Sequence, residues 1–310
     1  MLKGIARLPV LLTMTAVISC LFLIMLSFIH AGDTKRTGML SVHGQIFSVG
    51  YDKNVIGVYT PAGKRICTYK AGEGGSKFFS SCISDLDADG VDELLLVVGK
   101  QKKEYGEYLL ILKPVAGEGD VRLDAAGDTR LDAAGDTRPD SAGDTRETPV
   151  LEQLYRFDMG EINPWKVQTC DVDGDGRKEI SVGVYKKAVF HPVMAKRPFI
   201  YDWTDGHMSP KWLGSRLARP FDDYVFSDIN SDGKDELISD ELLADGSKAV
   251  NSYGWKGFGF ESTGGSGSYE DILDLRRTTG AAIEIKAVLN GHSKWITMQF
   301  ENGNIVEIKK

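Results

Sequence analysis

Three short segments of the chain carry acidic residues at every second position, followed by a glycine and then a glutamate. They are DLDADGVDEL from Asp85, DVDGDGRKEI from Asp171 and DINSDGKDEL from Asp228. Each has Asp at position 1, Asp or Asn at position 3, Asp at position 5, Gly at position 6 and Glu at position 9. Calcium prefers such ligands, because it takes roughly six to eight oxygens in irregular geometry. The spacing therefore predicts up to three Ca²⁺ sites.

The position of the glutamate distinguishes these segments from an EF-hand. An EF-hand places its bidentate Glu at position 12 and has flanking helices. Position 12 here is Leu96, Val182 or Ser239, none of which is a suitable ligand. The pattern instead predicts a calcium loop between two strands. Magnesium is disfavoured because it demands tighter octahedral geometry. A metal-free acidic turn is the alternative.

Strand patterns repeat around the acidic segments. Runs rich in β-branched and aromatic residues precede them, as in WKVQTC, and follow them, as in ELLLVVG. Two more strand candidates follow each loop, which gives units of four strands with the acidic loop between the first and the second. Residues 39–71 and 270–308 repeat the strand pattern without an acidic loop, and Asn-Gly pairs at Asn290 and Asn302 suit tight hairpins.

Five four-stranded units predict an all-β fold, a β-propeller of about five blades, because radial repetition leaves only short sheet edges. The terminal strands could share a blade that closes the ring. Repeated β-sandwich units are the alternative fold, although a sandwich does not explain one loop at a fixed place in each unit. The propeller is expected to occupy residues 32–310.

The DxDxDGxxE loop between strands, repeated in four-stranded units, resembles the FG-GAP repeat family (VCBS-type, integrin α N-terminal-like), whose members form calcium-bearing β-propellers. The resemblance covers residues 78–262 and concerns the metal-binding half of the repeat, since no clear Phe-Gly and Gly-Ala-Pro signature precedes the loops. The charge lost at Asn230 predicts weaker binding at the third site. The resemblance implies three ligand sets: Asp85, Asp87, Asp89, the Val91 carbonyl and Glu93; Asp171, Asp173, Asp175, the Arg177 carbonyl and Glu179; Asp228, Asn230, Asp232, the Lys234 carbonyl and Glu236.

The N-terminal segment 1–31 predicts a membrane anchor. Lys3 and Arg7 precede a run without charge, residues 8–29, which as a helix would span about 33 Å, close to one hydrocarbon core. We expect an uncleaved signal anchor, which makes the chain a single-pass protein of the cell membrane with an extracytoplasmic body. The alternatives are a cleaved signal peptide, which gives a secreted protein, and a lipoprotein modified at Cys20.

A tandem octapeptide interrupts the second unit. Residues 123–146 read LDAAGDTR, LDAAGDTR, PDSAGDTR, between two strand candidates that should be neighbours. So few apolar residues cannot offset the entropy of ordering, which predicts a disordered insertion over residues 117–148. A calcium-binding repeat is the alternative, although the glycine-dense nine-residue pattern is missing.

The composition favours a binding protein over an enzyme. The net charge of −7 argues against a nucleic-acid partner. The five histidines are scattered, and no HExxH, GxSxG, P-loop or CxxC motif occurs. We expect a bacterial binding or adhesion module for a protein or glycan of the cell envelope. The alternatives are a polysaccharide lyase or hydrolase on the same scaffold and a purely structural component. Residues 186–198 are expected to form a long loop suited to a ligand, and residues 257–268 a flexible connector.

Overall fold

The computed structural model describes residues 35–117 and 148–308. Over these residues the chain forms twenty β-strands and one short 3-10 helix, η1 (Gly160–Ile162), and no α-helix. The predicted all-β class is therefore confirmed. The strands follow one another as five antiparallel four-stranded meanders, which we number 1 to 5 in chain order. Meanders 1, 2 and 3 are separate sheets, whereas meanders 4 and 5 join in one eight-stranded sheet.

The strand boundaries match the predicted strand patterns closely. Meander 1 contains β1 (Lys35–Val42), β2 (Gln45–Asp52), β3 (Val55–Tyr59) and β4 (Arg65–Lys70). Meander 2 contains β5 (Ser76–Ser84), β6 (Glu93–Lys100), β7 (Tyr108–Gly117) and β8 (Thr148–Asp158). Meander 3 contains β9 (Pro164–Cys170), β10 (Glu179–Ala188), β11 (His191–Thr204) and β12 (His207–Leu213). Meander 4 contains β13 (Phe221–Ser227), β14 (Glu236–Leu242), β15 (Lys248–Trp255) and β16 (Phe260–Tyr269). Meander 5 contains β17 (Asp271–Arg277), β18 (Ile283–Leu289), β19 (His292–Glu301) and β20 (Asn304–Glu307).

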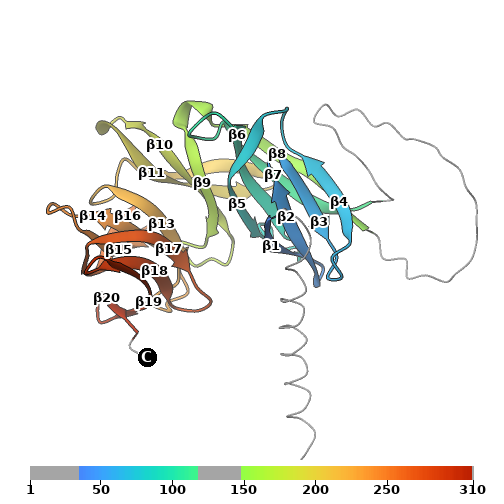
Figure 1. Cartoon of the computed structure of the whole chain (residues 1–310). Coiled ribbons are helices and arrows are strands. Elements are labelled where there is room, and N and C mark those ends of the chain that lie inside the picture. Colours follow the sequence, from blue (N-terminus) through green and yellow to red (C-terminus); the bar gives the residue numbers. More distant parts are fainter. Residues whose placement is uncertain (1–34, 118–147, 309–310) are drawn as a thin grey trace, which may run out of the picture.

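Meander 2 is buried on both faces, which explains the continuous apolar run of β6. Successive side chains of a strand point to opposite faces. Leu94 and Leu96 join the core shared with meander 1, whereas Leu95 and Val97 join the core shared with meander 3. The meanders therefore pack face to face in chain order. Figure 1 shows meander 1 at one side of the view and the eight-stranded sheet at the other.

The first strands of the meanders line up in the same order. β1 contacts β5, β5 contacts β9, β9 contacts β13, and β13 contacts β17. Each acidic loop connects the first strand of its meander to the second, in meanders 2, 3 and 4. The three loops therefore occupy equivalent places, because each follows the end of one of these aligned first strands.

Meanders 4 and 5 are joined at their last strands. β16 and β20 pair in parallel at Gly265 and Asn304. The neighbouring Gly264 approaches the Gly303 carbonyl so closely that a Cβ there would lie 2.4 Å from the oxygen. The terminal strands β1 and β20 each pair within their own meander. The suggested blade shared by both ends of the chain is thus not seen among the described residues.

Two expected loops are strands instead. Residues 186–198 belong to a long hairpin of β10 and β11. Arg197 connects the two strands of this hairpin: it is fully buried, and its guanidinium donates hydrogen bonds to the carbonyls of Lys186, His191 and Val193. Residues 257–268 are mostly β16, which pairs with β15. The two Asn-Gly turns are confirmed, since Asn290 and Asn302 have φ values of 51° and 49°.

The predicted localisation needs a correction. None of the described residues forms a helix that is long and apolar enough to cross a membrane. This finding contradicts the expected single-pass membrane protein. The segment 1–31, on which that expectation rested, lies outside the described residues, as does most of the insertion predicted over 117–148.

Candidate metal centres

The three acidic loops share one backbone conformation. In each loop the residues at positions 4 and 6 adopt a positive φ, between 60° and 87°. Glycine reaches this region without steric cost, whereas other residues pay about 1–2 kcal/mol for it. The glycine at position 6 is thereby explained. The residues concerned are Ala88 and Gly90, Gly174 and Gly176, and Ser231 and Gly233.

The alternating acids accept hydrogen bonds from the loop's own backbone. In the second loop, Asp171 accepts from the Gly176 N–H at 3.0 Å and Asp175 accepts from the Arg177 N–H at 2.9 Å. The other loops repeat both bonds with nearly the same distances. The spacing of the acids thus stabilises the turn through backbone hydrogen bonds, and it also suits a bound cation. The equivalent donors are Gly90 and Val91 in the first loop, and Gly233 and Lys234 in the third.

The glutamate at position 9 closes each loop from the strand side. Its carboxylate accepts a hydrogen bond from the backbone N–H at position 2, for example from Leu86 to Glu93 at 2.8 Å. The equivalent bonds are 3.0 Å long in the second loop and 3.2 Å in the third. Glu93, Glu179 and Glu236 are all buried, and so are their apolar neighbours at position 2. The shared apolar residue and the shared glutamate therefore form one structural unit.

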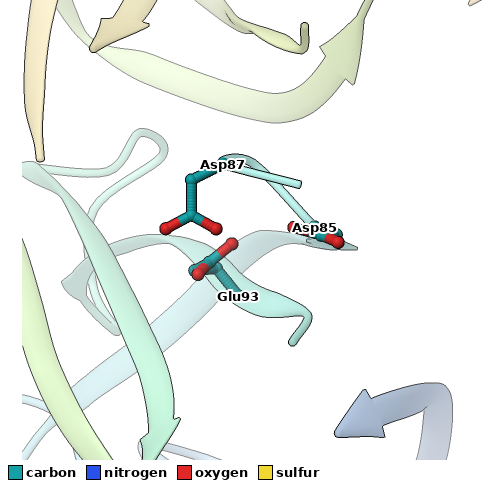
Figure 2. Close-up of side chains that lie close together, drawn as sticks. All are labelled: Asp85, Asp87 and Glu93. Atoms are coloured by element: carbon teal, nitrogen blue, oxygen red, sulfur yellow. The ribbon is translucent and has the colours of Figure 1, made fainter. Parts of the chain in front are cut away.

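In two loops the carboxylates gather closely enough to hold a metal ion. Asp85, Asp87 and Glu93 each offer an oxygen, and these oxygens lie within 4.8 Å of one another. Figure 2 shows the carboxylates of Asp87 and Glu93 turned toward each other, with that of Asp85 to one side. The other such cluster is the equivalent one in the second loop, formed by Asp171, Asp173 and Glu179.

A lysine ammonium lies in the first of these clusters. Lys113, from β7, places its Nζ 2.8 Å from Asp87, 2.7 Å from Asp89 and 2.7 Å from Glu93. Burial disfavours its charged form, but the hydrogen bonds to these three carboxylates outweigh burial and raise the pKa of Lys113. The pKa of Glu93 is raised by burial, against which Lys113 acts. The chain therefore supplies its own cation to this loop.

The second loop has the same arrangement with a different lysine. Lys211, from β12, lies 2.5 Å from Asp173, 2.5 Å from Glu179 and 3.2 Å from Asp202. Burial again opposes its charge, and the carboxylates again prevail and raise the pKa of Lys211. Lys113 and Lys211 come from different strands of their meanders. Their common feature is the place of the ammonium, beside the glutamate at position 9.

The third loop uses an amide in place of the ammonium. The Asn230 side chain donates to Glu236 at 2.8 Å and to Asp232 at 3.2 Å. No ion pair to Glu236 occurs among the described residues. Burial, followed by the negative charge of Asp232, raises the pKa of Glu236 to about 7. The loop with Asn at position 3 is thus the loop in which the glutamate lacks a cationic partner.

The predicted ligand sets are only partly brought together. The position 5 carboxylates, Asp89 and Asp175, lie outside the two clusters and accept hydrogen bonds from the backbone. Val91 is buried and pairs with Val42 in an isolated bridge. Metal binding by the carbonyls of Val91, Arg177 and Lys234 stays a prediction. The two lysines carried no sequence signal, because strand pairing rather than spacing in the chain brings them to the loops.

Comparison with known proteins leaves the family open. No protein-family model and no curated protein sequence matches the chain. Among solved structures, a candidate 6-phosphogluconolactonase from Bacteroides uniformis is similar, with a TM-score of 0.47 and 10% sequence identity. The similarity covers 86% of this chain and 68% of that chain.

Proposed function

We propose that the chain is a five-bladed β-propeller of the FG-GAP type that binds a protein or a glycan, with its acidic loops acting as cation-dependent braces. The observation that carries the proposal is the equivalence of the three loops. They share backbone conformation, hydrogen bonds and position between the first and second strands of their meanders. Calcium is the proposed ion because oxygen ligands in irregular geometry suit it.

The three loops should respond to calcium unequally. In the first two, calcium must displace or tolerate an ammonium that already offsets part of the carboxylate charge, and like charges repel. In the third, Asn230 can turn its oxygen toward the ion and no lysine competes. We therefore expect the third loop to respond most strongly to calcium, whereas its lost charge alone predicts the weakest site. Calcium bound there would stabilise the folded state, because it binds that state and not the unfolded chain.

Thermal unfolding of the whole chain tests the brace. We expect the midpoint to rise with added calcium, to rise less with magnesium at equal ionic strength, and to return with a chelator. Replacing Asp228 and Asp232 by Asn should remove most of the calcium response. A midpoint that is the same in calcium and in chelator contradicts the proposed ion. Binding itself is tested by screening the calcium-loaded chain against a glycan array and purified envelope proteins.

A further inference from the structure

A cleft of about 800 Å³ lies between meanders 1 and 2. Its rim is formed by the β4–β5 connection, residues 71–75, and by the β6–β7 connection, residues 101–107. β5 begins at this cleft and runs toward the first acidic loop, and β6 returns from that loop to the cleft. The cleft is therefore at the opposite end of these strands from the candidate metal centre. Its volume falls within the range of about 300–1,000 Å³ that small-molecule sites occupy.

The cleft is cationic in an acidic protein. Its lining contains Lys70, Lys100, Lys102 and Arg156 against two carboxylates, Glu73 and Glu107. Glu107 is engaged by Lys103 at 2.6 Å, which leaves its charge largely neutralised. The whole chain carries a net charge of −7, so a local positive excess is not a consequence of overall composition. A cleft lined by one sign of charge attracts ligands of the other sign.

Tyr108 supplies a polar group that lacks a well-formed hydrogen bond. The residue is only 7% exposed, and its hydroxyl makes no hydrogen bond of normal geometry among the described residues, although the Arg156 side chain lies close enough to interact with it. A buried polar group without a hydrogen bond destabilises the folded state. Gly72 lies against the hydroxyl, because a Cβ at that position would be 2.8 Å from it. The tyrosine thus presents a buried donor at the wall of a cationic cleft.

Arg156 lies directly above this tyrosine. Its guanidinium carbon is 3.7 Å from the centre of the Tyr108 ring. Stacking on an aromatic face fixes the plane of a guanidinium, whose N–H groups then point outward in a fork that fits two oxygens of a carboxylate or phosphate. The buried hydroxyl and the stacked guanidinium are therefore neighbouring donors for the same kind of group.

The glycine-rich rim of the cleft is held in place by the surrounding backbone. Asn54 is buried and donates to the carbonyls of Ala71 at 3.0 Å and Glu73 at 3.3 Å. The N–H of Gln101 donates to the carbonyl of Gly75 at 2.7 Å and so ties the two connections together. A rim that is ordered before binding reduces the entropy lost on binding.

We infer that this cleft binds a small organic anion, whose carboxylate or phosphate oxygens accept from the Tyr108 hydroxyl and the Arg156 guanidinium. The inference rests on the proposed binding function and narrows its ligand to an acidic molecule, such as a uronate-containing saccharide or a phosphorylated sugar. Lys100 and Lys102 add charge at the rim. The acidic loops take no part in the contact.

Calorimetric titration of the full chain tests the inference. The probes are digalacturonate, glucose 1-phosphate and inorganic phosphate, with the neutral disaccharide cellobiose for comparison. We expect saturable binding of an organic anion and none of cellobiose. Tyr108→Phe and Arg156→Gln should each weaken binding about ten- to one-hundred-fold, in line with one lost charge-assisted hydrogen bond. Lys187→Gln, at an exposed lysine of meander 3, is the matched control and should leave binding unchanged.

The variants separate a binding defect from a folding defect. Tyr108→Phe removes a hydroxyl that makes no hydrogen bond of normal geometry within the described structure, so its melting midpoint should equal or exceed that of the wild type. The inference is overturned if no anionic probe binds, or if binding is equal in the wild type and in both cleft variants. In either case the proposed binding of a protein or glycan still holds if a ligand from the glycan array binds the wild type and Tyr108→Phe equally well. Failure of every array ligand, with anion binding at the cleft intact, would instead limit the function to small molecules.

Discussion

Asp235 and Asp171 exchange two hydrogen bonds across the boundary between meanders 3 and 4. The Asp171 N–H donates to the Asp235 carboxylate at 3.0 Å, and the Asp235 N–H donates to the Asp171 carbonyl at 2.7 Å. Asp92 and Ser41 make the same pair of bonds between meanders 2 and 1, at 2.6 and 2.8 Å. The aspartate at position 8 of the first and third loops therefore fastens the loop to the preceding meander.

Removing this connection should destabilise the chain. Asp235→Ala leaves the buried Asp171 N–H without its acceptor, which we expect to cost about 1–3 kcal/mol of unfolding free energy. The matched control is Lys178→Ala, at position 8 of the second loop, where the smaller effect of an ordinary substitution is expected. Urea denaturation measures both. Equal losses in the two variants would contradict the role given to Asp235.

Lys113→Met tests the internal cation. The methionine keeps the apolar stem but leaves Glu93, Asp87 and Asp89 without their ammonium, which we expect to cost about 2–4 kcal/mol in chelator. Calcium should restore more stability to this variant than to the wild type, because the competing charge has gone. Lys103→Met removes an exposed ion pair instead and should cost about 0–1 kcal/mol. A calcium response identical to that of the wild type would show that the ammonium does not occupy the metal's place.

Asn230→Asp tests the third loop by adding a carboxylate, whereas Lys113→Met removes a cation from the first loop. The substitution replaces the amide that donates to Glu236 with a second carboxylate, which we expect to cost about 1–3 kcal/mol in chelator. Added calcium should then stabilise the variant more than the wild type, since the ion gains a charged ligand. Asn304→Asp, at an exposed residue of β20, provides the control. Melting curves in calcium and in chelator give the comparison; a smaller calcium response in Asn230→Asp than in wild type would argue against a cation in this loop.

Position 4 of the first loop offers a stabilising substitution. Ala88 has a φ of 60°, whereas the second loop has glycine at the equivalent position. Ala88→Gly should therefore stabilise the chain by about 0.5–1 kcal/mol, because it relieves the left-handed strain. Gly90→Ala, two residues later, introduces strain and should destabilise by about 1–2 kcal/mol, although the nearest atom to its Cβ position, His43 Nδ1, is 4.0 Å away. Thermal unfolding of the pair should shift in opposite directions; shifts of the same sign would refute the argument.

Asp240 should make stability depend on pH. Burial raises its pKa to about 6 in the folded chain from an ordinary value of 3.8. Between these two values the folded state holds more protons than the unfolded state, so the contribution of Asp240 to stability decreases as pH rises from about 4 to 6 and is constant above. Asp240→Asn should flatten this decrease. At pH 7 we expect the free energy of unfolding of the variant to exceed that of the wild type by up to about 2–3 kcal/mol. Unfolding free energies at several pH values check the slope; parallel profiles for both chains would rule out Asp240 as its source.

Local patterns predicted the strands and the loop geometry well. The alternation and β-branched content of segments such as WKVQTC placed the strands, and the repeated acidic pattern placed the three loops between first and second strands. The cationic partners could not be predicted, because Lys113 and Lys211 reach the loops through strand pairing. The long hairpin of β10 and β11 was missed for a similar reason. Its order depends on Arg197, whose buried guanidinium is visible only once the two strands are paired.

The burial of meander 2 on both faces has a consequence for folding during translation. When residues 76–158 have left the ribosome, Leu94 and Leu96 can already pack on meander 1, but Leu95 and Val97 have no cover until meander 3 follows. Each newly made meander thus carries one exposed apolar face, and such faces promote aggregation of nascent chains. Folding that advances from the N-terminus with translation would leave only one such face at a time, at the growing end.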